Sequence, residues 1–116
     1  MISLIILIVV AIEHLFFGYI EMFGSREIKS KAFGFEEKEL NNPLLQTALA
    51  NQGIYNVGFG LLILLFLSLQ VTPIVLIGMM SFVILVGAYG AYTVDKKIFL
   101  LQVVPAILGI FSLTMS

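Results

Sequence analysis

The stretch ALANQGIYNVGFGLLILLFL, residues 48–67, decides the fold because it joins a long apolar run to closely spaced polar side chains. Its second half is almost wholly apolar and belongs to a segment long enough to cross a bilayer, which takes ~20 helical residues. Its first half places Asn51, Gln52, Tyr55 and Asn56 within six positions. Polar groups are costly in hydrocarbon unless they find partners. The stretch therefore predicts a membrane helix whose polar side chains meet other helices or a ligand.

The composition of the whole chain also indicates an integral membrane protein. Of its 116 residues, 60% are hydrophobic and only 11% are charged, and the mean hydropathy is +1.12. A soluble domain of this length does not have enough interior to hide that much apolar surface. The formal net charge of −1 excludes a large basic field, so we expect no nucleic-acid partner. The absence of cysteine excludes disulfides and thiolate metal sites.

Four apolar segments predict an all-α fold, an integral membrane four-helix bundle that forms a single domain over residues 1–116. The expected helices cover about 2–23, 43–68, 73–93 and 96–115. The first segment has no basic stretch before it and no small-residue cleavage site after it. We therefore interpret it as a retained helix and not as a signal peptide.

Residue types at the ends of the segments support these boundaries. Asn42 and Asp95 suit the N-caps of the second and fourth helices, and Pro43 suits a first turn. Pro105 lies inside the fourth helix and predicts a kink there. Neighbouring helices make such a kink tolerable in a membrane.

The charges predict the orientation of the bundle. All basic residues lie in the first and third loops, which four crossings place on one side: Arg26, Lys29, Lys31, Lys38, Lys96 and Lys97. The positive-inside rule makes that side cytoplasmic, so both termini are expected outside a multi-pass inner (cytoplasmic) membrane protein. The long cytoplasmic loop, residues 24–42, has Ile28, Ala32 and Phe35 at helical spacing. This pattern fits a short amphipathic helix on the membrane surface or a solvated linker, and it leaves open whether the loop is a lid.

Polar side chains of all four helices fall in the cytoplasmic half of the membrane or at its midplane when each residue contributes a rise of about 1.5 Å. His14 lies ~12 Å from the inner surface, and residues 51–56 lie about 12–20 Å from it. The outer halves of the helices are almost wholly apolar. We therefore predict a bundle that is sealed outside and has a polar pocket open to the cytoplasm. The predicted ligand-binding residues are Glu13, His14, Tyr19, Glu21, Asn51, Gln52, Tyr55, Asn56, Tyr89, Tyr92 and Gln102.

The ionisable residues of the first helix carry the candidate chemistry. Glu13 and His14 are the candidate catalytic residues, since they suit proton relay or general acid–base catalysis. Alternatively, Glu13 bonds the amides of the second helix and only holds the bundle together. For Glu21 we favour a structural pairing with Arg26 or Lys97 near the interface. One histidine and scattered carboxylates give no recognisable metal spacing, so we expect no metal site, and the cofactor is unknown.

Other polar and small residues have structural interpretations beside the functional one. The carboxamides of the second helix fit either ligand contact or hydrogen bonding between helices. Tyr89 and Tyr92 fit either the pocket or an interfacial aromatic belt. Glycines at positions 53, 60, 87 and 90 fit close packing of helices better than ligand binding.

Six motifs spread over nearly the whole chain carry a resemblance to a known family. They are EH at 13–14, YIEMF at 19–23, FG at 33–34, ANQGIYN at 50–56, GAYGAYTV at 87–94 and KIFLLQVVPA at 97–106. In these motifs the chain resembles an uncharacterised family of small bacterial integral membrane proteins, domain of unknown function 1304. The ANQG-x-YN motif is the most specific of the six. The resemblance implies a small four-helix membrane protein and no particular activity.

Three functions stay open at this level. The first is a protein that binds or transports a small, partly lipophilic molecule, with Glu13 and His14 coupled to protons. Four helices make a thin wall, so this function predicts a homo-oligomer surrounded by membrane lipid. The second is a membrane-embedded enzyme that acts on a lipophilic substrate through acid–base chemistry of the same two residues. The third is a structural membrane subunit.

Overall fold

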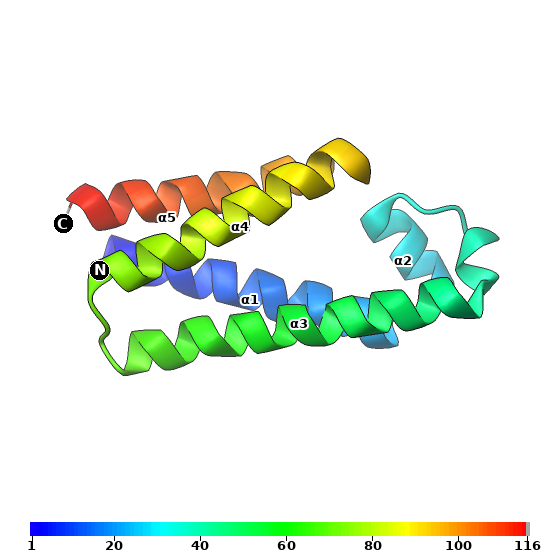
Figure 1. Cartoon of the computed structure of the whole chain (residues 1–116), viewed down its shortest axis with the longest axis horizontal. Helices are drawn as coiled ribbons and strands as arrows, with labels where there is room; N and C mark the ends of the chain where they lie inside the picture. The colour runs from blue at the N-terminus through cyan, green and yellow to red at the C-terminus, as the bar shows by residue number, and fades with distance from the viewer. Residues whose placement is uncertain (116) are drawn as a thin grey trace.

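Helices make up the regular structure of residues 1–115, the part of the chain that the computed structural model describes; no strand occurs in this range. Figure 1 shows the longer helices side by side, with the start of the first and the end of the last at one end of the molecule and a short helix at the other. The elements are α1 (Ile2–Phe23), α2 (Arg26–Phe33), the 3₁₀ turn η1 (Glu39–Asn41), α3 (Pro43–Ser68), α4 (Pro73–Thr93), the π-helical turn η2 (Phe99–Val103) and α5 (Val104–Met115).

Three of the four expected helices are present over the expected residues, as α1, α3 and α4. The side chain of Asn42 caps α3, since its Oδ1 accepts a hydrogen bond from the backbone N–H of Leu44 at 2.9 Å. Pro43 and Pro73 occupy the first turns of α3 and α4, where the missing N–H needs no partner. Asp95 Oδ1 accepts from the backbone N–H of Lys97 at 2.9 Å, at the start of the last helical segment.

The fourth expected helix has an irregular first half. Pro105 has no amide hydrogen, so the carbonyl of Leu101 lacks its usual donor four residues later. Before the proline the backbone widens into η2, where the N–H of Val104 donates to the carbonyl of Phe99, five residues earlier. The irregularity that Pro105 predicted therefore takes the form of a π-helical turn preceding α5.

Small residues let the backbones of α1 and α3 approach closely. A Cβ atom added to Gly18 would lie 2.5 Å from the carbonyl oxygen of Gly53, and one added to Gly53 would lie 2.7 Å from that of Gly18. A Cβ atom on Gly60 would lie 2.8 Å from a carbonyl oxygen of α1. Gly87 admits the side chain of Val103, whose Cγ2 would lie 2.8 Å from an added Cβ. These glycines serve close helix packing.

The apolar core occupies the half of the bundle near the termini and draws on all four long helices. Its buried members are Leu7, Val10, Ala11, Ile63, Leu76, Met80, Val83, Ala106 and Leu113. Many other large apolar side chains, such as Phe82, Leu85 and Phe111, are exposed on the outer surface. Helices α1, α3 and α4 are long and apolar enough to cross a membrane, and Phe99–Met115 is apolar but shorter. These features suit a membrane protein, whose outer surface faces lipid.

The loop over residues 24–42 contains the helix α2 and the turn η1. Ser25 caps α2 by accepting from the N–H of Ile28 at 3.2 Å, and Gly34 ends it with a φ of 79°. The helix α2 is one of the two alternatives that the sequence left open for this loop, and its placement on a membrane surface stays a prediction. Ile28 is exposed, and the buried residue of α2 is Lys29.

Candidate functional site

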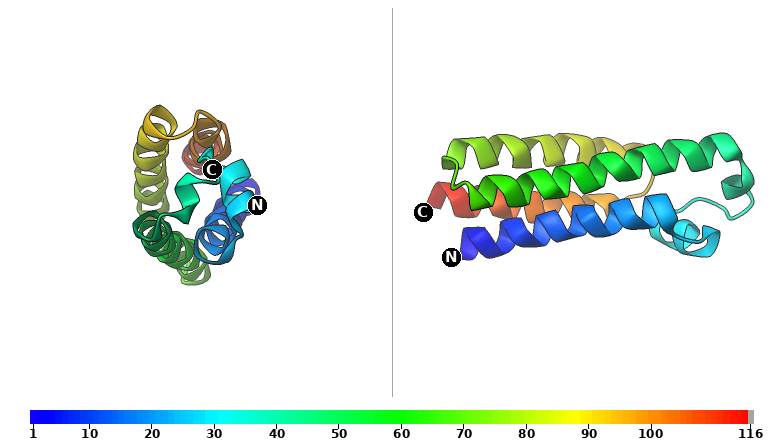
Figure 2. Two further views of the ribbon diagram at one scale, coloured as in Figure 1. Left: turned by 90° about the vertical axis from the view of Figure 1, so that its right-hand side faces the viewer. Right: turned by 90° about the horizontal axis from the view of Figure 1, so that it is seen from below.

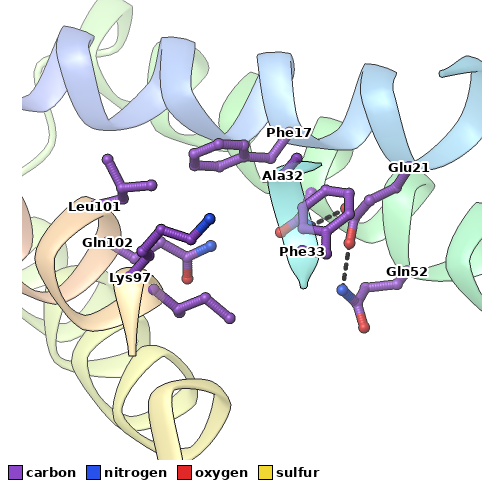
Figure 3. Close-up of a pocket in the computed structure, with 10 residues that line it drawn as sticks. Phe17, Glu21, Ala32, Phe33, Gln52, Lys97, Leu101 and Gln102 are labelled. Carbon is purple, nitrogen blue, oxygen red and sulfur yellow. Dashed lines mark hydrogen bonds between the residues drawn. The ribbon is translucent and has the colours of Figure 1, made fainter. Parts of the chain in front are cut away.

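A cavity lies where α1, α2, α3 and the start of the last helical segment meet, towards the end of the bundle opposite the termini (Figure 3). The cavity has a volume of about 50 Å³, measured as the space that the centre of a water molecule can reach, which is enough for a few waters or a small polar group. Its lining residues are Phe17, Glu21, Ala32, Phe33, Gln52, Asn56, Lys97, Ile98, Leu101 and Gln102. Four of the predicted ligand-binding residues are thus brought together here, namely Glu21, Gln52, Asn56 and Gln102.

Two carboxamides of α3 hold Glu21 of α1. Gln52 donates from Nε2 to Glu21 Oε2, and Asn56 donates from Nδ2 to Glu21 Oε1 at 2.5 Å. The two amides are four residues apart and therefore project from one face of α3. Glu21 is only 1% exposed, and a buried carboxyl group needs such partners. The interpretation in which Glu13 only holds the bundle together predicted that Glu13 bonds these amides. They instead donate to Glu21, which lies two turns further along α1.

Gly53 makes this arrangement possible because it stands between the two amides in the sequence. A Cβ atom added to Gly53 would lie 3.1 Å from the Cβ of Glu21 and 2.6 Å from the Cγ of Met22. A larger residue would push α1 away and pull Glu21 out of reach of the amides. The motif ANQGIYN thus combines two amide donors with the small residue that lets α1 approach them.

Lys97 and Gln102 lie across the cavity from Glu21 (Figure 3). The Nζ atom of Lys97 donates to the carbonyl oxygen of Lys31 at 3.1 Å and lies 3.6 Å from Asp95 Oδ2. Lys97 was a predicted partner of Glu21, and the two line the same cavity without an ion pair between them in the described structure. The side chain of Gln102 forms no hydrogen bond within residues 1–115. The cavity therefore has polar groups on opposite walls.

Apolar side chains complete the lining. Phe17 of α1 and Leu101 of η2 contribute to the walls. Ala32 and Phe33 of α2 lie between the wall that holds Glu21 and the wall that holds Lys97 and Gln102 (Figure 3). The loop over residues 24–42 thus covers part of the cavity. The space combines hydrogen-bonding groups with apolar and aromatic surface, which is the usual chemistry of a small-molecule site.

Glu13 and His14 do not line the cavity. His14 is 4% exposed, its Nδ1 lies 2.8 Å from the carbonyl oxygen of Val10, and its ring packs 5.2 Å from the ring of Phe59. Glu13 is partly buried and forms no hydrogen bond in the described part of the chain. Their catalytic role stays a prediction from the sequence. Among the described residues, no three His, Cys, Asp or Glu side chains come close enough to hold a metal ion.

The other five predicted ligand-binding residues are exposed away from the cavity: Tyr19, Asn51, Tyr55, Tyr89 and Tyr92. Asn51 and Tyr55 each precede a cavity residue by one position, which turns them about 100° around α3. The four tyrosines are between 61% and 85% exposed. Tyr19, Tyr89 and Tyr92 lie close to the helix ends that face the basic loops, which suits an interfacial aromatic belt, whereas Tyr55 lies near the middle of α3.

Six cavity residues were not among those predicted, namely Phe17, Ala32, Phe33, Lys97, Ile98 and Leu101. Two signals in the sequence pointed to this region: the FG motif at 33–34 and the pairing considered between Lys97 and Glu21. Helical phase offers another, because Phe17 precedes Glu21 by four residues and so shares its face.

Comparison with known proteins assigns the family. The family model for DUF1304, described as a protein of unknown function, matches residues 8–114. The chain belongs to this family. The uncharacterized protein YpaA of Lactococcus lactis subsp. lactis (strain IL1403) is 37% identical over 113 residues, which cover 95% of this chain and 94% of that relative. The resemblance drawn from the six motifs is thus confirmed. No solved structure matches the chain. The matched DUF1304 region includes every residue that lines the cavity.

Proposed function

We propose that this DUF1304 protein is a multi-pass protein of the cytoplasmic membrane that binds a small amphiphilic molecule in the cavity around Glu21. One observation carries the proposal: a buried carboxyl group, held by Gln52 and Asn56, has an apolar-walled space beside it. Protein interiors are normally close-packed. A polar contact that served only to join α1 to α3 would need no such space.

The membrane placement rests on length, apolarity and charge. Three helices are long enough to cross a bilayer, and Phe99–Met115 supplies the fourth crossing in this proposal. The start of α1 and the end of α5 lie at the same end of the molecule (Figure 2), as an even number of crossings requires. The positive-inside rule then places the basic end, with α2 and the cavity, on the cytoplasmic side.

The lining suggests an amphiphile and not a purely polar ligand. Glu21 and Lys97 bring hydrogen-bonding groups from opposite walls, while Phe17, Phe33 and Leu101 offer apolar surface. The open volume accommodates a headgroup, and the rest of such a molecule would extend beyond the cavity. His14 lies outside the lining, so the geometry does not favour the enzyme alternative. Transport and a homo-oligomer stay predictions from the sequence.

The proposal is tested by filling the cavity. Ala32 lines the cavity, whereas Ala88 on α4 is exposed elsewhere. We expect mass spectrometry of the protein purified in mild detergent to detect retained small molecules in the wild type and in Ala88→Trp. Ala32→Trp should lose them, because the indole occupies their place. Equal retention by both variants would contradict the proposed site.

A further inference from the structure

We infer that the cavity recognises a hydrogen-bond-donating ammonium group attached to an apolar chain. This inference rests on the proposed binding function and names the chemistry of the ligand. An amine of this kind occurs as a free alkylamine or as the headgroup of an aminophospholipid, and both present the same N–H donors.

The first argument comes from the orientation of the two carboxamides. A carboxamide has a donor end and an acceptor end. Gln52 and Asn56 turn their donor ends towards Glu21, so their carbonyl oxygens point away from it. No described residue donates to Gln52 Oε1 or Asn56 Oδ1. Each amide nitrogen keeps a second N–H, but the two carbonyl oxygens and the remaining lone pairs of the Glu21 carboxyl oxygens make acceptors the majority on this wall, and their natural partner is a group rich in N–H donors.

The second argument comes from the remaining walls. The rings of Phe17 and Phe33 line the cavity, and aromatic faces attract cations. Lys97 is the cation on the opposite wall. Its Nζ donates to the backbone carbonyl oxygen of Lys31 at 3.1 Å and lies 3.6 Å from the carboxylate of Asp95, which supplies a counter-charge. Because these two partners offset its charge, Lys97 repels a bound ammonium group only weakly. The Lys97 side chain is also a suitable donor to the phosphate of an aminophospholipid.

The inference is tested on the full chain in phosphatidylcholine nanodiscs. The probes are decylamine and decyltrimethylammonium, which share chain and charge but differ in N–H donors, with decanoate as an anion. We expect calorimetry to show decylamine bound roughly ten- to a hundredfold more tightly than the quaternary amine, as the loss of charge-assisted hydrogen bonds implies. This comparison needs no variant and so does not depend on a variant's folding.

Variants then locate the binding and separate the two proposals. Asn56→Leu should weaken decylamine binding about tenfold or more, and the matched Asn51→Leu, on the exposed face, should not. If the quaternary amine or decanoate binds as tightly and Asn56→Leu weakens it, the ligand chemistry is wrong and the binding function stands. If binding of no probe depends on Asn56, both proposals fail.

A lipid arm distinguishes the source of the amine. In nanodiscs with equal phosphatidylethanolamine and phosphatidylcholine, native mass spectrometry should show the ethanolamine lipid enriched on the wild type if the headgroup is the ligand. Equal retention of the two lipids together with selectivity for decylamine would assign the site to a free amine. Both outcomes support recognition of N–H donors.

A different set of contacts carries a second inference: we propose that α2 is a lid that opens on the side of Lys97. The hydrogen bond that joins α2 to α3 is buried: Lys29, which is 4% exposed, donates from Nζ to Gln46 Oε1 at 2.6 Å. Gln46 in turn donates to the carbonyl oxygen of Leu40 at 2.6 Å. On its other side, α2 is joined to the start of the last helical segment by a hydrogen bond from the exposed Lys97 to the carbonyl oxygen of Lys31. Ala32 and Phe33 of α2 line the cavity, as does Lys97 itself, so release of the exposed hydrogen bond would uncover the cavity.

The lid is tested by a reversible disulfide. A Cβ atom on Gly34 would lie 3.8 Å from the Cβ of Asp95, close to the ~3.8 Å typical of disulfides. The chain has no cysteine and no tryptophan, so Gly34→Cys with Asp95→Cys supplies the only thiols and Phe33→Trp the only indole. Oxidation should remove most of the acrylamide quenching of that indole, and reduction should restore it.

Controls address the effect of the substitutions themselves. The single cysteine variants should show quenching that oxidation does not change. If the disulfide forms and quenching is the same in both redox states, α2 does not open and the lid is excluded. Gly34 has a φ of 79°, which strains a cysteine there, so the single Gly34→Cys variant is also checked for the helix content of the wild type. If that content is kept and no disulfide forms, α2 does not rest against Asp95, which equally overturns the inference.

Discussion

Two faces of α3 carry similar polar residues with different partners. Gln52 and Asn56 donate to the buried Glu21 of α1, whereas Asn51 and Tyr55, one position earlier in each turn, form no hydrogen bond among the described residues. The residue types hardly differ, and the separation is about 100° around the helix axis. The comparison shows that a carboxamide of α3 becomes part of the cavity wall only where its face of the helix meets another helix closely.

The largest difference in stability is expected between Gly53→Ala and Gly58→Ala, because the two changes act in opposite directions. The Cβ added at Gly53 would lie 2.7 Å from the backbone oxygen of Gly18 and 2.6 Å from the Cγ of Met22, so α1 and α3 must separate. Overpacking of this kind costs about 1–3 kcal/mol of unfolding free energy. Gly58→Ala is the matched control, because no atom lies within 4 Å of its added Cβ, and helix propensity there favours alanine by roughly 0.5–1 kcal/mol. Unfolding in mixed micelles with rising SDS measures both, and equal changes would break the comparison.

The second effect separates two asparagines on the same helix. Asn56→Leu removes a hydrogen bond to a buried carboxyl group and should lower the unfolding free energy by about 1.5–3 kcal/mol. Asn51→Leu removes a side chain without a hydrogen-bond partner among the described residues, and its effect should stay within about 0.5 kcal/mol. Thermal unfolding followed by circular dichroism tests this pair. A larger loss from Asn51→Leu would show that the outward face also binds something.

A smaller difference in the stability of α2 is expected between substitutions of its two lysines. Lys29→Met removes the buried bond to Gln46 and should destabilise α2 by about 1 kcal/mol or more. Lys31→Met removes an exposed pair with Glu27, which is worth about 0.5 kcal/mol or less. Hydrogen–deuterium exchange of residues 26–33 reports on both, and faster exchange in Lys31→Met than in Lys29→Met would refute the anchoring role of Lys29.

The smallest effect is expected from Tyr55→Phe. The phenol is 73% exposed and has no hydrogen-bond partner within the described residues. Its removal should change the unfolding free energy by less than about 0.5 kcal/mol and leave decylamine binding unchanged. A loss of binding by calorimetry would move the ligand from the inward to the outward face of α3.

Much of the fold followed from the sequence because its signals are local. Hydropathy located the helices, and Asn42 and Pro43 marked where α3 begins. The turn η2 did not follow, because Pro105 predicts only that the regular hydrogen bonding fails there. The packing of Val103 against Gly87 is a tertiary contact of η2 that the sequence does not display.

The site followed only in part because depth along a helix does not fix rotation about it. Depth grouped Asn51 with Gln52, but close packing at Gly18 and Gly53 turns only Gln52 towards Glu21. The functional weight given to Glu13 and His14 came from their ionisable chemistry, which does not show which face of α1 meets the cavity. Phe33 belongs to a loop whose path depends on Lys29 and its partner, and no local pattern revealed that path.

The π-helical turn η2 bears on how the length of this protein can vary. A turn closed across five residues holds one residue more than an α-helical turn. Deleting one residue within Phe99–Val103 would narrow the turn to α-helical width and leave Lys97 and Ile98 at nearly the same rotation relative to α5, because the wide turn absorbs the additional residue. Leu101 and Gln102, which lie within the turn, would shift, whereas the buried positions of α5, Ala106, Gly109 and Leu113, would keep their register. Changes in length at η2 would thus reshape the cavity wall while the apolar core, beyond the joint, stays as it is.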